Sequence, residues 1–213
     1  ADLSAVRRGT LTVFASQTIS SYWLPAILVR FHETYPRIDL RLEIGNTAQC
    51  ARAVLNGEAD LGFIEGAVEE PALAVELVAK DQLVVVVGAE HPWRKSPPSF
   101  PADFTRTEWA LREPGSGTRS SFEAALRRFD IPVSEMRITM ELPSNEAVCA
   151  AVAASQLATA VSETVAHAGV STGKLFAVPS QLPSRDFSMI RHRERQLSRA
   201  SEAFRQMIPA GSS

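Results

Sequence analysis

The stretch TLTVFASQTISSYWLPAILVRFHETYP, residues 10–36, decides the fold. Residues 10–15 are mostly apolar or β-branched and predict a strand, and residues 16–21 predict a polar turn. One face of a helix follows, because apolar residues recur at helical spacing until Pro36. These residues are Leu24, Ile27, Leu28, Phe31 and Tyr35. A strand, a turn and an amphipathic helix in this order are typical of an α/β domain.

The same alternation continues outward from this stretch. Further strands are predicted at residues 39–44, 60–64, 82–87, 109–112, 137–141, 158–161 and 187–191. Helical patterns fall between them, near residues 51–57, 122–129, 144–154, 163–168 and 197–208. The first 64 residues therefore indicate a parallel sheet with helical crossovers, and the pattern restarts at about residue 82.

Two β/α lobes of similar plan follow from this pattern. The first lobe has three clear strands, which is few for a stable sheet, so we expect the tail to return and complete it. We predict lobe I at residues 1–78, lobe II at residues 79–168 and the return to lobe I at residues 169–213. The chain would cross between the lobes near residues 76–82 and 162–174, which makes a hinge.

The composition is that of an ordinary globular protein. Of the 213 residues, 45% are hydrophobic and 22% are charged, and the formal net charge is -2. This charge does not favour nucleic acid or an acidic membrane, and no apolar run reaches the roughly 18–20 residues of a membrane span. The two cysteines, Cys50 and Cys149, are too few for a disulfide framework, so a reducing cytoplasm is favoured.

Four turns between a strand and a helix are rich in hydroxyl, amide and glycine residues. In parallel sheets, ligands collect beyond the carboxyl ends of the strands, where helix starts offer free N–H groups to an anion. Each turn can also be a plain helix N-cap, so a single turn does not identify a site. The candidate residues are Ser16, Gln17, Thr18, Asn46, Thr47, Gly115, Ser116, Gly117, Thr118, Ser144 and Asn145.

The sequence REPGSGTR at residues 112–119 is the richest of these turns. Its glycines allow close approach of the backbone to a ligand, and two arginines flank it. It is neither a phosphate-binding P-loop nor a dinucleotide fingerprint, because the required lysine and third glycine are missing. Arg119 is a candidate ligand contact or a solvated charge, and so is Glu65, which follows a strand.

Motifs for catalysis or metal binding are missing from the sequence. The four histidines form no pair with zinc-ligand spacing, and no GxSxG elbow is present. Cys50 and Cys149 lie in predicted helices without a neighbouring histidine, and we expect both to be buried and inert. The sequence therefore predicts no catalytic residue, no metal and no cofactor.

Several segments, in order, resemble the effector-binding domain of LysR-type transcriptional regulators. They are GTLTVFAS at residues 9–16, FHETYP at 31–36, LNGEADLG at 55–62, EHP at 90–92 and REPGSGTR at 112–119. The resemblance runs from Gly9 to about Ile208, and the REPGSGTR loop is similar to the branch that regulates sulfur assimilation and carbon fixation.

The resemblance implies a type 2 periplasmic binding protein fold, with two Rossmann-like lobes and a ligand cleft at the hinge. It implies that a small effector, often an anion or carboxylate, binds between the lobes without catalysis. Family contacts map onto Ser16, Gln17, Thr18, Asn46, Thr47, Ser144, Asn145 and Glu146, with Gly115–Thr118 and Arg119 nearby. It also implies self-association to dimers or tetramers, in which the helix at residues 24–35 is a candidate interface.

Two departures from the family pattern are evident. The winged helix-turn-helix that precedes this domain in the family is missing here, so DNA would be bound only through that segment. The family's glycine-rich entry to a second-lobe strand is replaced by SQLAT at residues 155–159, without the usual left-handed glycine cap. The alternative functions are a solute-binding protein of a transporter and, with less support, an enzyme on a two-lobe scaffold.

Overall fold

A computed structural model describes residues 9–209 of the chain. The chain divides into two units: unit 1 comprises residues 1–80 and 186–213, and unit 2 comprises residues 81–185. The tail therefore returns to the first unit, as the small number of early strands predicts. The first crossing, after Lys80, falls within the predicted range, whereas the second falls after Arg185, beyond the predicted residues 162–174.

Unit 1 is built on a sheet with strand order β2-β1-β3-β9. Strand β1 (Gly9–Ser16) pairs in parallel with β2 (Ile38–Gly45) and with β3 (Leu61–Glu65). The returning strand β9 (Ser184–His192) pairs antiparallel with β3, with Phe63 opposite Met189. The parallel arrangement predicted for the first three strands is confirmed, and the returning strand runs the other way.

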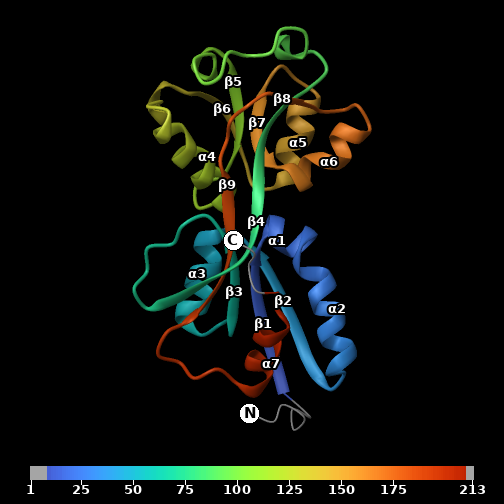
Figure 1. The fold of residues 1–213 in the computed structure, drawn as a ribbon, viewed down its shortest axis with the longest axis vertical. Helices are drawn as coiled ribbons and strands as arrows, with labels where there is room; N and C mark the ends of the chain where they lie inside the picture. The colour runs from blue at the N-terminus through green and yellow to red at the C-terminus, as the bar shows by residue number, and fades with distance from the viewer. Residues whose placement is uncertain (1–8, 210–213) are drawn as a thin grey trace. The chain divides into compact units, whose positions relative to one another are not determined.

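Helices cover both faces of the unit 1 sheet (Figure 1). Helices α1 (Gln17–Tyr22), α2 (Leu24–Thr34) and α7 (Arg199–Met207) pack on one face, over buried Leu11 and Val13 of β1. Helix α3 (Thr47–Asn56) packs on the other face against Ile64 and Ile190. The segment predicted as a polar turn at residues 16–21 forms α1 instead, because Ile19 is fully buried in the core.

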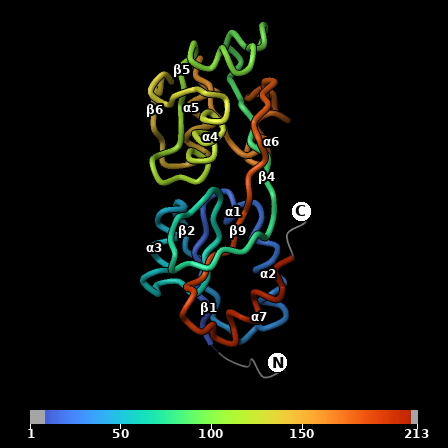
Figure 2. Tube along the Cα trace, turned by 60° about the vertical axis from the view of Figure 1, so that its left-hand side comes forward, coloured from blue at the N-terminus to red at the C-terminus, as the bar shows by residue number. Residues whose placement is uncertain are grey.

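Residues 186–209, the described end of the chain, belong to unit 1, where α7 lies near α2 and β1 (Figure 2). Helix α7 contacts α2 and β1, and Phe204 of α7 is fully buried. Its ring centroid lies 5.0 Å from that of Phe31 and 6.1 Å from that of Phe63. The first 80 residues therefore share one hydrophobic core with the returning tail.

Unit 2 has the strand order β4-β7-β5-β6, with β8 paired to β4. Strand β4 spans Leu73–Val87, longer than the predicted residues 82–87, and its end pairs antiparallel with β7 (Ala158–Ser162). Strand β5 (Glu108–Arg112) pairs in parallel with β6 (Arg137–Leu142) and β7. Strand β8 (Phe176–Val178), which was not predicted, adds to β4 and keeps the chain in unit 2 beyond residue 168.

Two apolar layers hold the unit 2 sheet. Helix α4 (Gly117–Arg128) packs over Trp109 and Leu111 of β5. Helices α5 (Asn145–Ala153) and α6 (Glu163–Ser171) pack over Ala110 and Val161 on the other face. Three short 3-10 helices complete the unit: η2 (Pro92–Arg94), η3 (Phe104–Arg106) and η4 (Val133–Glu135).

A serine replaces the glycine cap that the family pattern places after α5. The helix ends at Ala154 with φ -100°, so no left-handed residue is required there. The Ser155 hydroxyl donates to the carbonyl oxygen of Ala151 at 2.7 Å and accepts from the Leu157 N–H at 3.2 Å. The side chain thereby satisfies backbone groups at the helix end.

Candidate functional site

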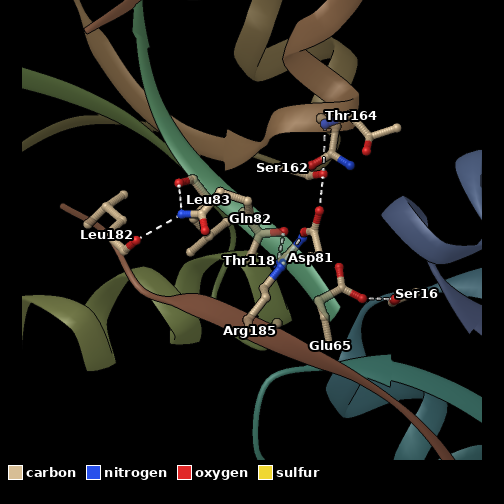
Figure 3. Close-up of polar contacts among 12 residues, drawn as sticks. Ser16, Glu65, Asp81, Gln82, Leu83, Thr118, Ser162, Thr164, Leu182 and Arg185 are labelled. Carbon is tan, nitrogen blue, oxygen red and sulfur yellow. Dashed lines mark hydrogen bonds and ion pairs between the residues drawn. The ribbon is translucent and has the colours of Figure 1, made fainter. Parts of the chain in front are cut away.

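A buried carboxylate and two hydroxyl groups form a polar cluster at the strand ends of unit 1, and Figure 3 shows two of its members, Ser16 and Glu65. Ser16 ends β1 and Glu65 ends β3, and both side chains are about 1% exposed. The Ser16 hydroxyl donates to Oε2 of Glu65. Thr47, the first residue of α3, donates its hydroxyl to the carbonyl oxygen of Glu65 at 2.9 Å. Two residues proposed from separate turns, Ser16 and Thr47, therefore meet at Glu65.

The direction of the Ser16 hydrogen bond determines what this side chain offers to a ligand. A serine hydroxyl has one hydrogen, and that hydrogen is used on Glu65. Ser16 therefore presents lone pairs to any further partner. Thr18 is buried in the next helix, and Gln17 is half-buried; both side chains have interactions of their own.

Asn46 has a clear role in holding its own helix. Its side chain accepts from the Gln49 N–H at 2.9 Å, while the Gln49 side chain accepts from the Asn46 N–H at 2.8 Å. This reciprocal pair is a capping box, which satisfies free N–H groups at the start of α3. The N-cap alternative stated for this turn is confirmed for Asn46.

The REPGSGTR loop forms the start of α4 in unit 2. Gly115 adopts a left-handed backbone with φ 91°, a conformation that favours glycine. Ser116 caps the helix by accepting from the Arg119 N–H at 3.4 Å. Gly117 and Thr118 occupy the first two positions of α4, and both are buried. The Thr118 side chain is therefore fixed in the first turn of a twelve-residue helix.

A chain of hydrogen bonds connects Thr118 to Asp81 and Arg185, the first and last residues of unit 2 in the sequence (Figure 3). Nη1 of Arg185 donates to Oγ1 of Thr118 at 2.9 Å, and Nε of Arg185 donates to Oδ2 of Asp81 at 2.7 Å. The Ser162 hydroxyl donates to Oδ1 of Asp81 at 2.7 Å. All four residues are at most 9% exposed. The network therefore joins β4, β7, β9 and α4 through buried polar groups.

A second buried arginine holds the start of α5. Arg112 is 3% exposed and donates from Nη1 to Oδ1 of Asn145 at 2.8 Å. Its other nitrogens pair with both carboxylate oxygens of Glu113, at 2.8 and 3.1 Å. Ser144 caps the same helix by accepting from the Ala147 N–H at 3.0 Å, and Glu146 is exposed. The strand end of β5 thus positions Asn145.

The Arg119 guanidinium is engaged by carboxylates of its own unit. Nε pairs with Glu123 at 2.8 Å, Nη1 pairs with Glu141 at 2.9 Å, and Nη1 also donates to the Arg112 carbonyl oxygen at 3.2 Å. Burial lowers the pKa of Arg119, but the hydrogen bonds and charges of Glu123 and Glu141 outweigh it and leave the pKa raised. The positive charge of Arg119 is therefore compensated by two carboxylates.

Sequence reasoning missed Asp81, Ser162 and Arg185 as members of a polar cluster. Asp81 and Arg185 are about a hundred residues apart in the chain, and each resembles a solvated charge at the edge of a strand. One signal was available: Asp81 directly precedes the apolar run QLVVVV at residues 82–87, which places a charge at the entry to a buried strand. Its partner could not be identified without the fold.

Burial keeps both cysteine thiols protonated. It raises the pKa of Cys50 to about 12 and that of Cys149 to about 11, with a smaller contribution from Glu65 and Glu146 respectively. Cys50 is buried as predicted, whereas Cys149 is half-buried, and a raised pKa makes both thiols weak nucleophiles. Among residues 9–209, no group of three His, Cys, Asp or Glu side chains could hold a metal ion. No helix in the same part of the chain has the length and apolar character of a membrane span.

Comparison with known proteins identifies the family. The family model described as LysR substrate binding domain matches residues 4–212. The HTH-type transcriptional regulator YeiE of Escherichia coli (strain K12), which is described as uncharacterized, is 33% identical over 198 residues. This match covers 92% of the chain but 66% of the relative, so the chain spans just under two thirds of that protein.

Solved structures with the same fold include two effector-binding domains. The effector binding domain of QuiR, in complex with shikimate, has a TM-score of 0.84 at 18% identity and covers 94% of this chain and 95% of its own. The CcmR regulatory domain of Synechocystis PCC6803, in complex with 2-PG, has a TM-score of 0.83 at 24% identity, covering 94% and 96%. The predicted α/β class and type 2 periplasmic binding protein fold are confirmed. The chain belongs to the LysR substrate binding domain family.

Proposed function

We propose that this domain senses a small oxyanion or carboxylate, and that unit 2 binds the anion at the start of α4. The observation that carries this proposal is the buried hydroxyl of Thr118, placed in the first turn of α4 directly after the glycine-containing loop. A hydroxyl and helix-start N–H groups are donors that suit an anion. Shikimate, which is in complex with the QuiR domain, carries a carboxylate.

The proposed binding surface of each unit consists of residues from its strand-to-helix turns. In unit 2 it comprises Gly115, Ser116, Gly117, Thr118, Ser144, Asn145 and Glu146, with Arg119 as a charge-compensated neighbour. In unit 1 it comprises Ser16, Gln17, Thr18, Asn46, Thr47 and Glu65. These surfaces bind a ligand without reacting with it, so the domain acts as a sensor and not as an enzyme.

In the whole protein, the domain controls a DNA-binding segment that lies outside the 213 residues. The E. coli relative named as an HTH-type regulator, of which this chain spans 66%, supports this proposal. The effector favours one conformation of the regulator through its differential affinity, and coupling of about 1–3 kcal/mol is typical of such control. The protein works in the cytoplasm, where the DNA is. It self-associates to dimers or tetramers, and the exposed side of α2 is a candidate interface.

Binding assays on the domain test the anion site. We would measure thermal shifts and then calorimetric affinities for sulfate, thiosulfate, inorganic phosphate, O-acetylserine and shikimate. Thr118→Val removes the hydroxyl and keeps the side-chain shape, so the bound anion should lose at least about tenfold in affinity, since hydrogen bonds to charged groups are worth about 1.5–3 kcal/mol. Ser16→Ala removes the hydrogen bond to Glu65 and tests the proposed surface of unit 1, so a ligand that contacts this surface should also lose affinity.

Thr172→Val is a matched control, because Thr172 caps the end of α6 and its hydroxyl donates to the Ala168 carbonyl oxygen at 2.8 Å. It should leave ligand affinity unchanged. An anion that binds Thr118→Val and Ser16→Ala as tightly as the parent domain would contradict the proposed location of the site.

A further inference from the structure

We propose that Arg185 is a positioning residue of the effector site in unit 2: by holding Thr118, it reserves that position for a group that only accepts hydrogen bonds. This inference rests on the proposed function, because it assumes that the effector meets Thr118. It adds a residue and a chemical requirement for the ligand. The contacts on which it rests, from Arg185 to Thr118 and Asp81, join residues of unit 2.

The direction of one hydrogen bond is the first step. A guanidinium has donors and no acceptor, so in the 2.9 Å contact between Nη1 of Arg185 and Oγ1 of Thr118 the threonine oxygen must accept. The Thr118 hydroxyl then has its own hydrogen left to donate in another direction. Arg185 is 6% exposed and Thr118 is 1% exposed, so water does not readily compete for this hydrogen bond.

The second step is that Arg185 itself is held at several points. Its Nε pairs with Asp81 at 2.7 Å, and Asp81 receives the Ser162 hydroxyl at 2.7 Å. Ser162 in turn accepts from the Thr164 N–H at 3.2 Å, at the start of α6. The position of the guanidinium is therefore set by groups on β4, β7 and α6, and not by Thr118 alone.

The backbone beside Arg185 is tied to the same strand. Nε2 of Gln82 donates to the carbonyl oxygen of Leu182 at 2.8 Å, three residues before Arg185 (Figure 3). Two adjacent residues of β4, Asp81 and Gln82, thus hold the segment that carries Arg185. A side chain fixed in this way can orient the hydroxyl that it contacts.

The chemical consequence concerns the ligand atom that meets Thr118. With its oxygen occupied by Arg185, Thr118 acts as a donor toward the ligand, so the ligand must present an oxygen that is not protonated. Sulfate, phosphate and carboxylate oxygens satisfy this requirement. A ligand that places an ammonium or an obligatory O–H donor there is disfavoured, because two hydrogens would oppose each other in a buried site.

Calorimetry on the whole domain, with sulfate and inorganic phosphate as probes, tests this inference by a double-mutant cycle. One arm is Thr118→Val and the other is Arg185→Gln with Asp81→Asn, which removes the ion pair without leaving a buried charge unpaired. We expect each arm to weaken the tighter-binding probe, Thr118→Val by about tenfold and the paired substitution by several-fold. Combined, they should weaken it no more than Thr118→Val alone, because Arg185 acts through Thr118.

Two further variants keep the test interpretable. If the paired substitution does not fold, Arg185→Lys takes its place. It retains the charge opposite Asp81, but its single ammonium cannot reach both Asp81 and Thr118 as the guanidinium does, so we expect a partial loss of affinity. Arg106→Gln removes an exposed arginine of unit 2 that pairs with Asp103 at 2.9 Å, and it should leave affinity unchanged.

A measurement without ligand completes the test. Three-bond NMR couplings of Thr118 should show one χ1 rotamer in the parent domain and averaging between rotamers when Arg185 is replaced. An unchanged single rotamer, or substitutions whose effects on affinity simply multiply, would overturn the role of Arg185 while leaving the anion site in place. If neither probe binds, or if Thr118→Val has no effect on binding, the proposed site fails as well.

Discussion

His91 is held neutral inside unit 2 by two hydrogen bonds. Its Nδ1 accepts from the Trp93 N–H at 3.0 Å, so the ring hydrogen is on Nε2, which lies 2.9 Å from Oγ1 of Thr107. The side chain is 3% exposed, and burial lowers its pKa below the ordinary value of 6.5. Protonation would place a hydrogen against the Trp93 N–H, so the folded state resists it.

The resulting pH dependence has a definite sign. The unfolded chain protonates His91 near pH 6.5, whereas the folded state stays neutral to lower pH, so the unfolded state binds more protons in between. The free energy of unfolding should therefore fall as pH drops below about 6.5, by at most about 1.4 kcal/mol per pH unit. Urea unfolding of the parent and of His91→Gln between about pH 7.5 and about pH 5 measures this. The two pH values lie on either side of the ordinary histidine pKa.

Glutamine can reproduce both hydrogen bonds without titrating, so the His91→Gln curve should lack this component. Equal slopes for the two proteins across the same pH range would contradict the assignment to His91.

At the residue scale, the sequence predicts caps better than buried ion pairs. Asn46, Ser116 and Ser144 could be proposed as N-caps because a cap bonds to N–H groups only a few positions away. The partners of Arg185 are set by the fold: Thr118 is 67 residues away and Asp81 is 104 residues away. Such pairs leave no periodic pattern in the sequence, so the most buried part of the candidate site could not be predicted.

At the scale of elements, one close approach determines how β4 meets α5. A Cβ added to Gly88 would overlap the carbonyl oxygen of Val152 and would lie 3.1 Å from that of Ser155. These are backbone atoms at the end of α5, which cannot rotate away. Glycine is therefore required where the end of β4 passes the end of this helix.

We predict that Gly88→Ala destabilises the domain by about 1–3 kcal/mol, because overpacking against backbone forces the elements apart. Gly169→Ala is a suitable comparison. Its added Cβ would meet atoms of the Leu175 side chain and no backbone atom, so Leu175 has to shift, while alanine favours the helix in which Gly169 lies. Its effect should be smaller than that of Gly88→Ala. Urea unfolding compares the two variants, and similar losses of stability would contradict the close approach described for Gly88.

Elements in which apolar residues recur over many positions were predicted well. Short elements, and elements that contain charged residues, were not. Helix α2 has eleven residues and a clear apolar face, and its predicted extent was nearly right. Helix α1 has six residues, too few to show a period, and β8 has three. The first half of β4 contains Glu76 and Lys80, and these charges concealed a strand that begins at Leu73.

At the scale of the whole molecule, the tail is part of the core of unit 1. Phe187, Met189 and Phe204 of the tail share one apolar cluster with Leu11 and Phe31 of the first segment. The sequence predicted this return, because three early strands were too few, but it placed the second crossing too early. Strand β8 and helix α6 hold the chain in unit 2 by contacts that no local pattern reveals.

Phe204→Ala should destabilise unit 1 by about 3–5 kcal/mol, since it removes a fully buried ring that packs on Phe31 and Phe63. Hydrogen exchange read by mass spectrometry assigns the effect to a unit: protection should fall in β1 and β3. The control is Phe122→Ala, which removes a fully buried ring from unit 2, where protection should fall in β5 instead. Loss of protection in unit 2 alone after Phe204→Ala would contradict the shared core.

The path of the chain also orders events during synthesis. Unit 2 is one uninterrupted segment whose synthesis is complete once residue 185 is made, whereas unit 1 waits for β9 and α7, which come later in the chain. Domains generally fold as units as they emerge. Until β9 and α7 are made, the nascent protein carries the unpaired edge of β3 and a face of β1 that α7 does not yet cover, and a premature stop before residue 186 removes Phe187, Met189 and Phe204 from the core of unit 1.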